Sequence, residues 1–129
     1  MAAVFSRMRV LIVEADRGLR ERMGAILADD GCDVALAADA REATELAYHG
    51  CPDAVILGMD EQPIYRLRIA VESLRYVCDA PFTLLGTGTR RRVDVLTALG
   101  VVDFLPQPIE VGAVQNFIRR ARPDASHAA

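Results

Sequence analysis

Asp53-Ala54-Val55-Ile56-Leu57-Gly58-Met59-Asp60, residues 53–60, is the stretch that decides the fold of this chain. It is a short apolar run bounded by Pro52 and by turn-forming residues up to Pro63. Such a run is typical of a strand buried on both faces in the middle of a parallel sheet. In an open α/β sheet, ligands and reacting groups lie just beyond the carboxyl ends of these strands. Gly58 occupies that end, so a place suited to a reactive carboxylate carries no side chain.

Strand-length apolar runs alternate with amphipathic segments along the rest of the chain. We expect further strands at residues 10–13, 34–37, 82–85 and 102–105, and helices at 17–29, 40–49, 64–77, 90–99 and 111–120. Asp16, Asp39 and Thr89 are suited to cap helices, and Gly31 and Gly100 to end them. This alternation predicts one α/β domain with a doubly wound, five-stranded parallel sheet. Residues 1–8 are expected to form an extension, 9–120 the domain and 121–129 a disordered tail.

Composition narrows the classes of function. The 129 residues, 52% of them hydrophobic and 26% charged, favour one soluble domain. No segment resembles a membrane span or a signal peptide, which predicts a cytoplasmic location. The formal net charge of -3 argues against general nucleic-acid binding, and all fifteen basic residues are arginine. Three widely spaced cysteines, Cys32, Cys51 and Cys78, are expected to be structural thiols and not metal ligands.

Several segments carry a family resemblance through their order and spacing. The segments are Val10-Leu11-Ile12-Val13-Glu14-Ala15-Asp16, Gly31-Cys32-Asp33-Val34, residues 52–57, Ala80-Pro81-Phe82 and residues 98–105 followed by Gln107-Pro108. From about Met8 to Arg120 the chain therefore resembles a response-regulator receiver (CheY-like) domain. The resemblance implies a flavodoxin-like strand order of 2-1-3-4-5. It also implies a cis Gln107-Pro108 bond, whereas trans is the ordinary expectation for a bond before proline.

The resemblance also implies a chemistry whose residues are largely missing. A receiver domain accepts a phosphoryl group from a histidine kinase on an aspartate after the third strand, with Mg²⁺ held by two carboxylates after the first strand. A hydroxyl after the fourth strand and a lysine after the fifth bind the phosphoryl oxygens. The corresponding residues here are Gly58 for the acceptor, Glu14 and Ala15 for the acidic pair, Gly86 for the hydroxyl and Gln107 for the lysine. The chain thus looks like a degenerate receiver (pseudo-receiver), with no metal, cofactor or enzymatic activity expected.

A displaced phosphorylation site is an alternative. Asp60 lies two residues beyond Gly58, Thr87 follows the expected hydroxyl position, and Glu14 with Asp16 could hold Mg²⁺. A carboxylate that projects from the loop would be misplaced for in-line transfer, and small misplacements are costly. The structural alternatives are a solvated acidic loop for Asp60, a polar strand end for Glu14 and a helix cap for Asp16.

Two features suggest how a partner could bind. Arg90, Arg91 and Arg92 open the predicted fourth helix, where cations oppose the helix dipole; they form either a solvated charge run or a docking patch for an acidic partner. Phe104 matches the family's switching aromatic, although a packed core ring is an equal alternative. Glycines and hydroxyls in residues 86–89 could instead bind a phosphate or another small ligand.

The sequence as a whole predicts a stand-alone pseudo-receiver of two-component (phosphorelay) signalling. It would act as a phosphorylation-independent interaction module. Its expected partners are signalling proteins: a histidine kinase, a phosphotransferase or a downstream regulator. A homodimer through the face of the fourth helix, fifth strand and fifth helix stays open, as does a flavodoxin-like small-ligand binder. Nucleic acid and membranes are not expected partners.

Overall fold

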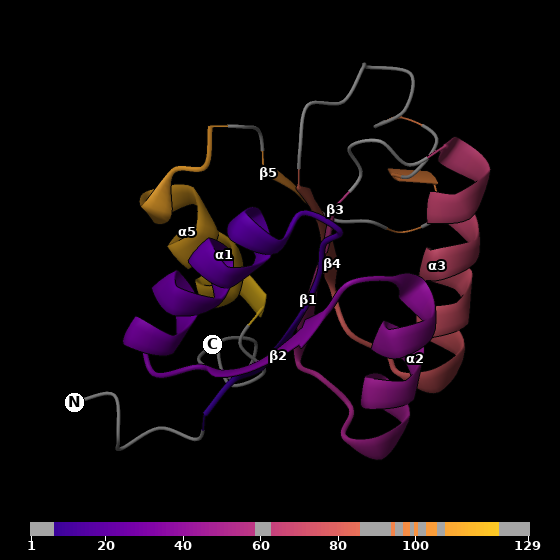
Figure 1. Ribbon diagram of the computed structural model, residues 1–129, viewed down its shortest axis with the longest axis horizontal. Coiled ribbons are helices and arrows are strands. Elements are labelled where there is room, and N and C mark those ends of the chain that lie inside the picture. The colour runs from indigo at the N-terminus through magenta and orange to yellow at the C-terminus, as the bar shows by residue number, and fades with distance from the viewer. Residues whose placement is uncertain are drawn as a thin grey trace, which may run out of the picture.

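The structure is a computed structural model that describes residues 7–58, 63–85, 94, 97–98, 100, 103–105 and 108–121. Five strands form one sheet with helices on both faces (Figure 1). The strands are β1 (Arg9–Val13), β2 (Asp33–Ala37), β3 (Ala54–Gly58), β4 (Phe82–Leu85) and β5 (Asp103–Leu105). The helices with defined bounds are α1 (Arg17–Asp29), α2 (Ala40–His49), α3 (Ile64–Val77) and α5 (Val111–Ala121).

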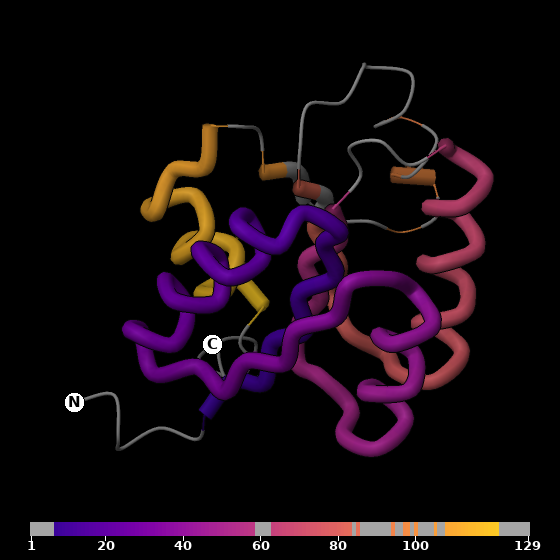
Figure 2. Tube along the Cα trace, in the orientation of Figure 1, coloured from indigo at the N-terminus to yellow at the C-terminus, as the bar shows by residue number. Residues whose placement is uncertain are grey.

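The sheet has the predicted topology. Its order is β2-β1-β3-β4-β5 and every pairing is parallel, with Ile12 opposite Ile56 and Val55 opposite Phe82. Helices α1 and α5 cover one face, while α2 and α3 pack side by side on the other (Figures 1 and 2). The predicted flavodoxin-like α/β fold is confirmed. Because all strands run the same way, their carboxyl ends meet at one edge of the sheet.

Alternation along the strands divides the core into two layers. Leu11, Val55 and Phe82 face α2 and α3, whereas Ile12 and Ile56 face α1 and α5. Residues 54–57 of β3 are all buried, as expected for a central strand. Each large apolar side chain buried in these layers contributes about 1.5–3 kcal/mol relative to exposure.

Local signals place the helix ends. The side chain of Asp16 accepts a hydrogen bond from the Leu19 amide at 3.2 Å, and that of Asp39 accepts one from the Glu42 amide at 2.9 Å. These bonds satisfy amide donors that a helix start leaves unpaired. Past the end of α1, Gly31 has a φ of 88°, a left-handed conformation that favours glycine. The predicted caps Asp16 and Asp39 and the predicted stop at Gly31 are confirmed, whereas the predicted cap Thr89 lies outside the described residues.

Element ends differ from the predictions by one residue in several places. Strands β1 and β2 each begin one residue earlier, because the amide of Asp33 donates to the Met8 carbonyl at 2.8 Å and extends the ladder. Met8 is only 5% exposed and lies in the core beside α1 and α5, and Ala121 ends α5 against the same layer. Of the predicted fourth helix, the described residues Asp94, Thr97 and Ala98 are helical.

Candidate functional site

The ends of β1 and β3 lie side by side at the carboxyl edge of the sheet. Val13 is paired with Leu57, so the residues that follow them, Glu14 and Gly58, are neighbours across the two strands. The structure therefore brings together the expected acceptor position and one member of the expected acidic pair. Glu14 is 6% exposed, which makes it one of few charged side chains buried in the described part of the chain.

The carboxyl group of Glu14 fills the space beside Gly58. A Cβ atom placed on Gly58 would overlap Glu14 Oε1 and would lie 2.8 Å from its Cδ and 3.2 Å from the carbonyl oxygen of Val13. Carbon atoms in contact are ordinarily about 3.5–4.0 Å apart. A carboxylate from the end of β1 thus occupies the volume that an acceptor side chain on β3 would need.

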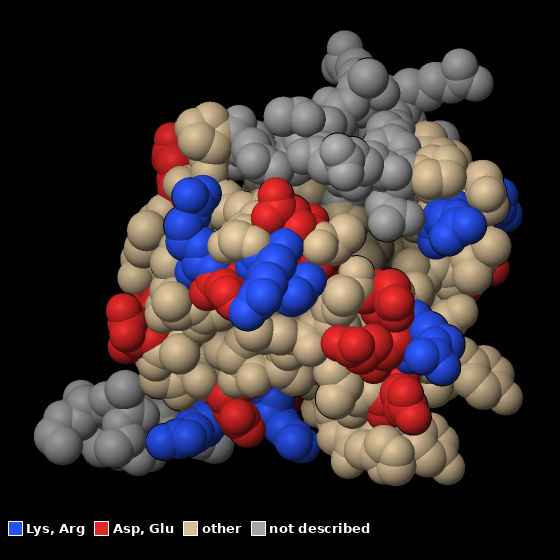
Figure 3. Space-filling model, in the orientation of Figure 1, with Lys and Arg blue, Asp and Glu red and all other residues tan. Residues whose placement is uncertain are grey.

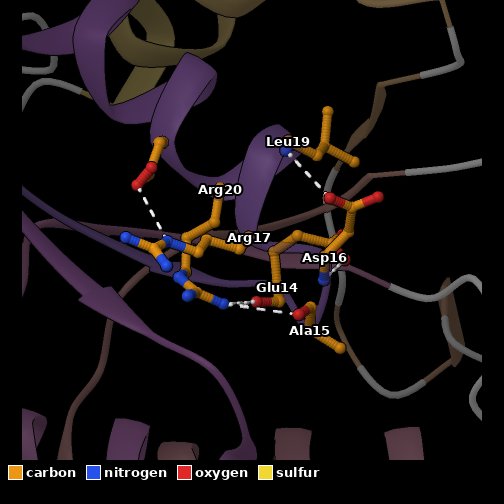
Figure 4. Close-up of polar contacts among 7 residues, drawn as sticks. Glu14, Ala15, Asp16, Arg17, Leu19 and Arg20 are labelled. Carbon is orange, nitrogen blue, oxygen red and sulfur yellow. Dashed lines mark hydrogen bonds and ion pairs between the residues drawn. The ribbon is translucent and has the colours of Figure 1, made fainter.

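Hydrogen bonds fix the turn that carries this carboxylate (Figure 4). The Glu14 amide donates to the Ala37 carbonyl at 3.0 Å, and Glu14 Oε2 accepts from the Asp16 amide at 2.8 Å. Arg20 Nη1 donates to the carbonyl oxygens of Glu14 at 2.7 Å and of Ala15 at 3.4 Å. Backbone and side chain of Glu14 are therefore both held, and its carboxyl group stays turned inward over Gly58.

The described residues do not fit a magnesium site of the receiver kind. Mg²⁺ prefers octahedral coordination by oxygen atoms, usually with one or two protein carboxylates. Ala15 offers no ligand, Asp16 Oδ1 caps the Leu19 amide, and Glu14 Oε2 accepts the Asp16 amide. In residues 7–58, 63–85 and the described segments beyond them, no three His, Cys, Asp or Glu side chains gather as a metal site.

A cavity of about 390 Å³ adjoins the Glu14–Gly58 contact. Its size falls in the range of small-molecule sites, about 300–1,000 Å³. Its walls are mainly apolar and carry three charged side chains, Glu14, Asp39 and Arg66; the apolar lining includes Val13, Leu57 and Ile69, with Tyr65 beside them. The sequence did not predict this cavity. The sequence feature that could have indicated the cavity is the pair of large apolar residues Tyr65 and Ile69, which lie one turn apart on α3. In the structure they are 59% and 56% exposed.

Other predicted site residues lie outside the described part of the chain. These are Asp60, Gly86, Thr87, Arg90, Arg91, Arg92 and Gln107. The backbone of Phe104 pairs with Leu84 in the sheet, but its side chain is likewise outside the description. The displaced phosphorylation site, the arginine patch, the aromatic switch and the cis Gln107-Pro108 bond therefore stay predictions.

The surface drawn in Figure 3 mixes charges of both signs. Acidic and basic side chains are interspersed over this face. Among the described residues, exposed ion pairs include Arg17–Glu21 at 3.3 Å. Exposed pairs of this kind contribute about 0–1 kcal/mol. Among the described residues, no helix combines the length and apolar character needed to cross a bilayer.

Comparison with known proteins shows which proteins this chain is similar to. No protein-family model matches the chain. The response regulator MprA of Mycolicibacterium vanbaalenii is 32% identical over 123 residues, which cover 91% of this chain and 53% of the relative. The response regulator MprA of Mycobacterium leprae is 31% identical, with 91% and 54% covered. The chain spans about half the length of these curated relatives.

Solved structures show the same fold. The chemotaxis protein CheY4 of Vibrio cholerae superposes with a TM-score of 0.80 at 24% identity, over 91% of this chain and all of that one. A two-component response regulator from Clostridium difficile gives a TM-score of 0.79 at 15% identity, over 89% of this chain and 95% of the other.

Proposed function

Because this chain is a receiver (CheY-like) domain of the response regulators of two-component signalling, we propose that it is a pseudo-receiver that works without aspartyl phosphorylation. The observation that carries the proposal is the Glu14 carboxyl group lying over Gly58, in the volume that an acceptor side chain would need. Loss of the acceptor aspartate could leave an open volume that a displaced acceptor could enter. In this chain the Glu14 carboxyl group, at the end of β1, fills that volume.

The surroundings of Glu14 also disfavour its own use as the acceptor. Phosphoryl transfer depends on positioning a nucleophile in line with the donor and on stabilising the charge of the transferred group. Glu14 lines the neighbouring cavity but is only 6% exposed, and its Oε2 already accepts the Asp16 amide, so its carboxyl group is engaged within the fold. Ala15 adds no second carboxylate, and the chain has no lysine to bind the transferred group.

A pseudo-receiver of this kind acts by binding. We propose that its partners are signalling proteins: a histidine kinase, a phosphotransferase or a downstream regulator. The proposed surface is the face of the predicted fourth helix with Arg90, Arg91, Arg92 and Phe104, and a homodimer through the same face is the variant form of this proposal. Support comes from the charge of the arginine run and from the family. The proposed location is the cytoplasm, and no enzymatic activity is proposed.

Phosphorylation is tested on the full chain with acetyl phosphate and Mg²⁺, followed by intact mass spectrometry. A receiver with an intact acceptor aspartate runs in parallel as the positive control. We expect no phosphoryl adduct on this chain. An adduct that disappears in Asp60→Asn would contradict the proposal and support the displaced site, and an adduct that disappears in Glu14→Gln would contradict it through Glu14 itself.

Binding is tested separately with the immobilised chain and a lysate of its native host. Wild type is compared with a variant in which Arg90, Arg91 and Arg92 are changed to glutamate. Selective loss of a signalling protein supports the arginine patch. Equal recovery from both forms counts against this patch as the binding surface. The phosphorylation test is not affected by that outcome.

The cavity beside Tyr65 favours small-ligand binding as a second candidate function. Its apolar walls and three charged groups match the composition of small-molecule sites. Native mass spectrometry of the purified chain, before and after denaturation, tests this candidate. A released compound whose occupancy falls in Tyr65→Ala supports it, while an unliganded chain in every preparation counts against it.

A further inference from the structure

Two cysteines lie on neighbouring segments at the opposite, amino-terminal edge of the sheet. Cys51 lies in the segment that leads into β3, and Cys78 ends α3 in the segment that leads into β4. Val55 and Phe82 are register partners, and each cysteine comes four residues before its partner residue. The Val55 amide also donates to the Pro81 carbonyl at 2.9 Å, which draws the two segments together before the strands begin.

This register suits a cross-link. The paired strands that the two segments enter lie about 4.7–4.9 Å apart, which is close to the 4.4–6.8 Å that a disulfide needs between its Cα atoms. The backbone at Cys78 is extended, with φ and ψ of -152° and 152°, so its segment already has strand-like geometry. Electrostatics agree with this placement: burial, together with the charge and hydrogen bonding of the neighbouring Cys51 thiol, raises the pKa of the Cys78 thiol to about 11.

The two thiols differ in access. Cys51 is exposed, whereas Cys78 is 5% exposed and packs in the core beside α2 and α3. An oxidant can therefore reach Cys51 first, and the neighbouring thiol of Cys78 is placed to react with the product. This pairing of an exposed thiol with a neighbouring resolving thiol is the arrangement that redox-sensing cysteines use. Disulfides of reducing compartments are commonly of this transient kind.

We propose that Cys51 and Cys78 form a reversible, redox-formed cross-link between the start of β3 and the start of β4. The oxidant is a peroxide. The Cys51 thiolate attacks one peroxide oxygen, the O–O bond breaks, and the products are Cys51 sulfenic acid and hydroxide or alkoxide. The Cys78 thiol then attacks the Cys51 sulfur, the S–S bond forms, the S–O bond breaks and water leaves. Two electrons pass from the thiols to the peroxide, and a dithiol reductant reverses the step by exchange.

This site is independent of the proposed function, because neither cysteine contributes to the carboxyl edge. The cross-link would enclose β3 and α3 in one loop. Closing such a loop stabilises a native fold that accommodates it, which for a domain of this size corresponds to a melting temperature higher by roughly 10 °C. The junctions entering β3 and β4 would then no longer separate.

The test treats the reduced, full chain with hydrogen peroxide, blocks free thiols with a maleimide and digests with trypsin. Trypsin cleaves after Arg66 and Arg75, which lie between the two cysteines. The peptide with Cys51, residues 42–66, and the peptide with Cys78, residues 76–90, therefore stay joined only if a disulfide links them. We expect that joined pair, an intact mass lower by two hydrogens, a higher melting temperature, and recovery of both thiols with dithiothreitol. Cys32→Ser is the matched control and should behave as wild type.

Two variants separate the steps. Cys51→Ser should abolish the joined pair, and Cys78→Ala should leave Cys51 as a sulfenic acid that dimedone traps. Because Cys78 is buried, folding of both variants is checked by circular dichroism. If Cys78→Ala unfolds, the result for Cys51→Ser, which changes an exposed residue, decides the test. A link through Cys32, dimers joined only through Cys51, or maleimide on both Cys51 and Cys78 after oxidation would overturn the proposal.

Discussion

Replacing Gly58 by alanine tests the central contact of the candidate site. Gly58 is not among the glycines of positive φ in the described residues, so its backbone accepts alanine without strain. A compatible Gly-to-Ala change ordinarily stabilises a protein by about 0.4–1 kcal/mol, since the unfolded chain loses freedom. At this position, however, the new methyl group overlaps Glu14 Oε1.

The overlap reverses the sign of the effect. Inserting a methyl group into a packed site costs about 1–3 kcal/mol, and disturbing the bond from the Asp16 amide to Glu14 Oε2 costs about 1 kcal/mol more. After the entropic gain is subtracted from these costs, Gly58→Ala should lower the free energy of unfolding by about 1–3 kcal/mol. In a Glu14→Ala background the methyl group enters vacated space, and the same change should be neutral or stabilising by up to about 1 kcal/mol. The coupling between the two positions is then about 2 kcal/mol.

Urea denaturation followed by far-ultraviolet circular dichroism measures this cycle, because the chain has no tryptophan to report by fluorescence. Gly112→Ala is the matched control: it lies in α5, and no described atom comes within 4 Å of an added Cβ. It should stabilise the chain by about 0.5–1 kcal/mol in both backgrounds. If Gly58→Ala has the same effect with and without Glu14, the carboxyl group does not occupy the acceptor volume and the reasoning fails.

Three further outcomes are expected. Leu74→Ala, in the core, should lower the free energy of unfolding by about 2–5 kcal/mol in urea, whereas Tyr76→Ala, 92% exposed, should change it by less than about 0.5 kcal/mol. Asp39→Ala removes the cap of α2 and should cost about 1 kcal/mol by the same assay. Burial, aided by Cys51, raises the pKa of folded Cys78 from 9.0 to about 11, so the unfolded chain releases this proton first. Stability should therefore fall by about 2 kcal/mol between pH 9 and pH 11 in reducing buffer, and Cys78→Ala should lack this fall.

The fold could be predicted because its signals are local. The continuous apolar run of β3 and the caps Asp16 and Asp39 each determine structure within a few residues. Periodicity failed in one detail, at Leu46. In α2, Leu46 has the helical spacing that places it with the apolar residues Ala43 and Ala47, which are 0% and 2% exposed, yet Leu46 is 38% exposed. Spacing gives a face of a helix but not how far that face extends over the sheet.

The candidate site could be predicted only in part, because its decisive contacts join distant segments. The sequence placed Gly58 and Glu14 at neighbouring strand ends, but a polar strand end gives no sign that its carboxyl group turns inward. That orientation depends on the empty volume at Gly58, on another strand. The cavity beside Tyr65 likewise depends on how α3 packs near the end of β1. The pairing of Cys51 with Cys78 follows from strand register, which spacing along the chain does not reveal.

The contact between Glu14 and Gly58 also constrains how this chain could regain a phosphorylation site. Gly58→Asp alone would bring a second carboxylate against the one already buried there, and two carboxylates sharing a site resist joint ionisation. The new side chain would meet both an occupied volume and a like charge. With Gly58→Asp alone, the Glu14 side chain would have to leave its place, whereas a second substitution at Glu14 would remove both the overlap and the like charge, so recovery of an acceptor at this position depends on two strands at once.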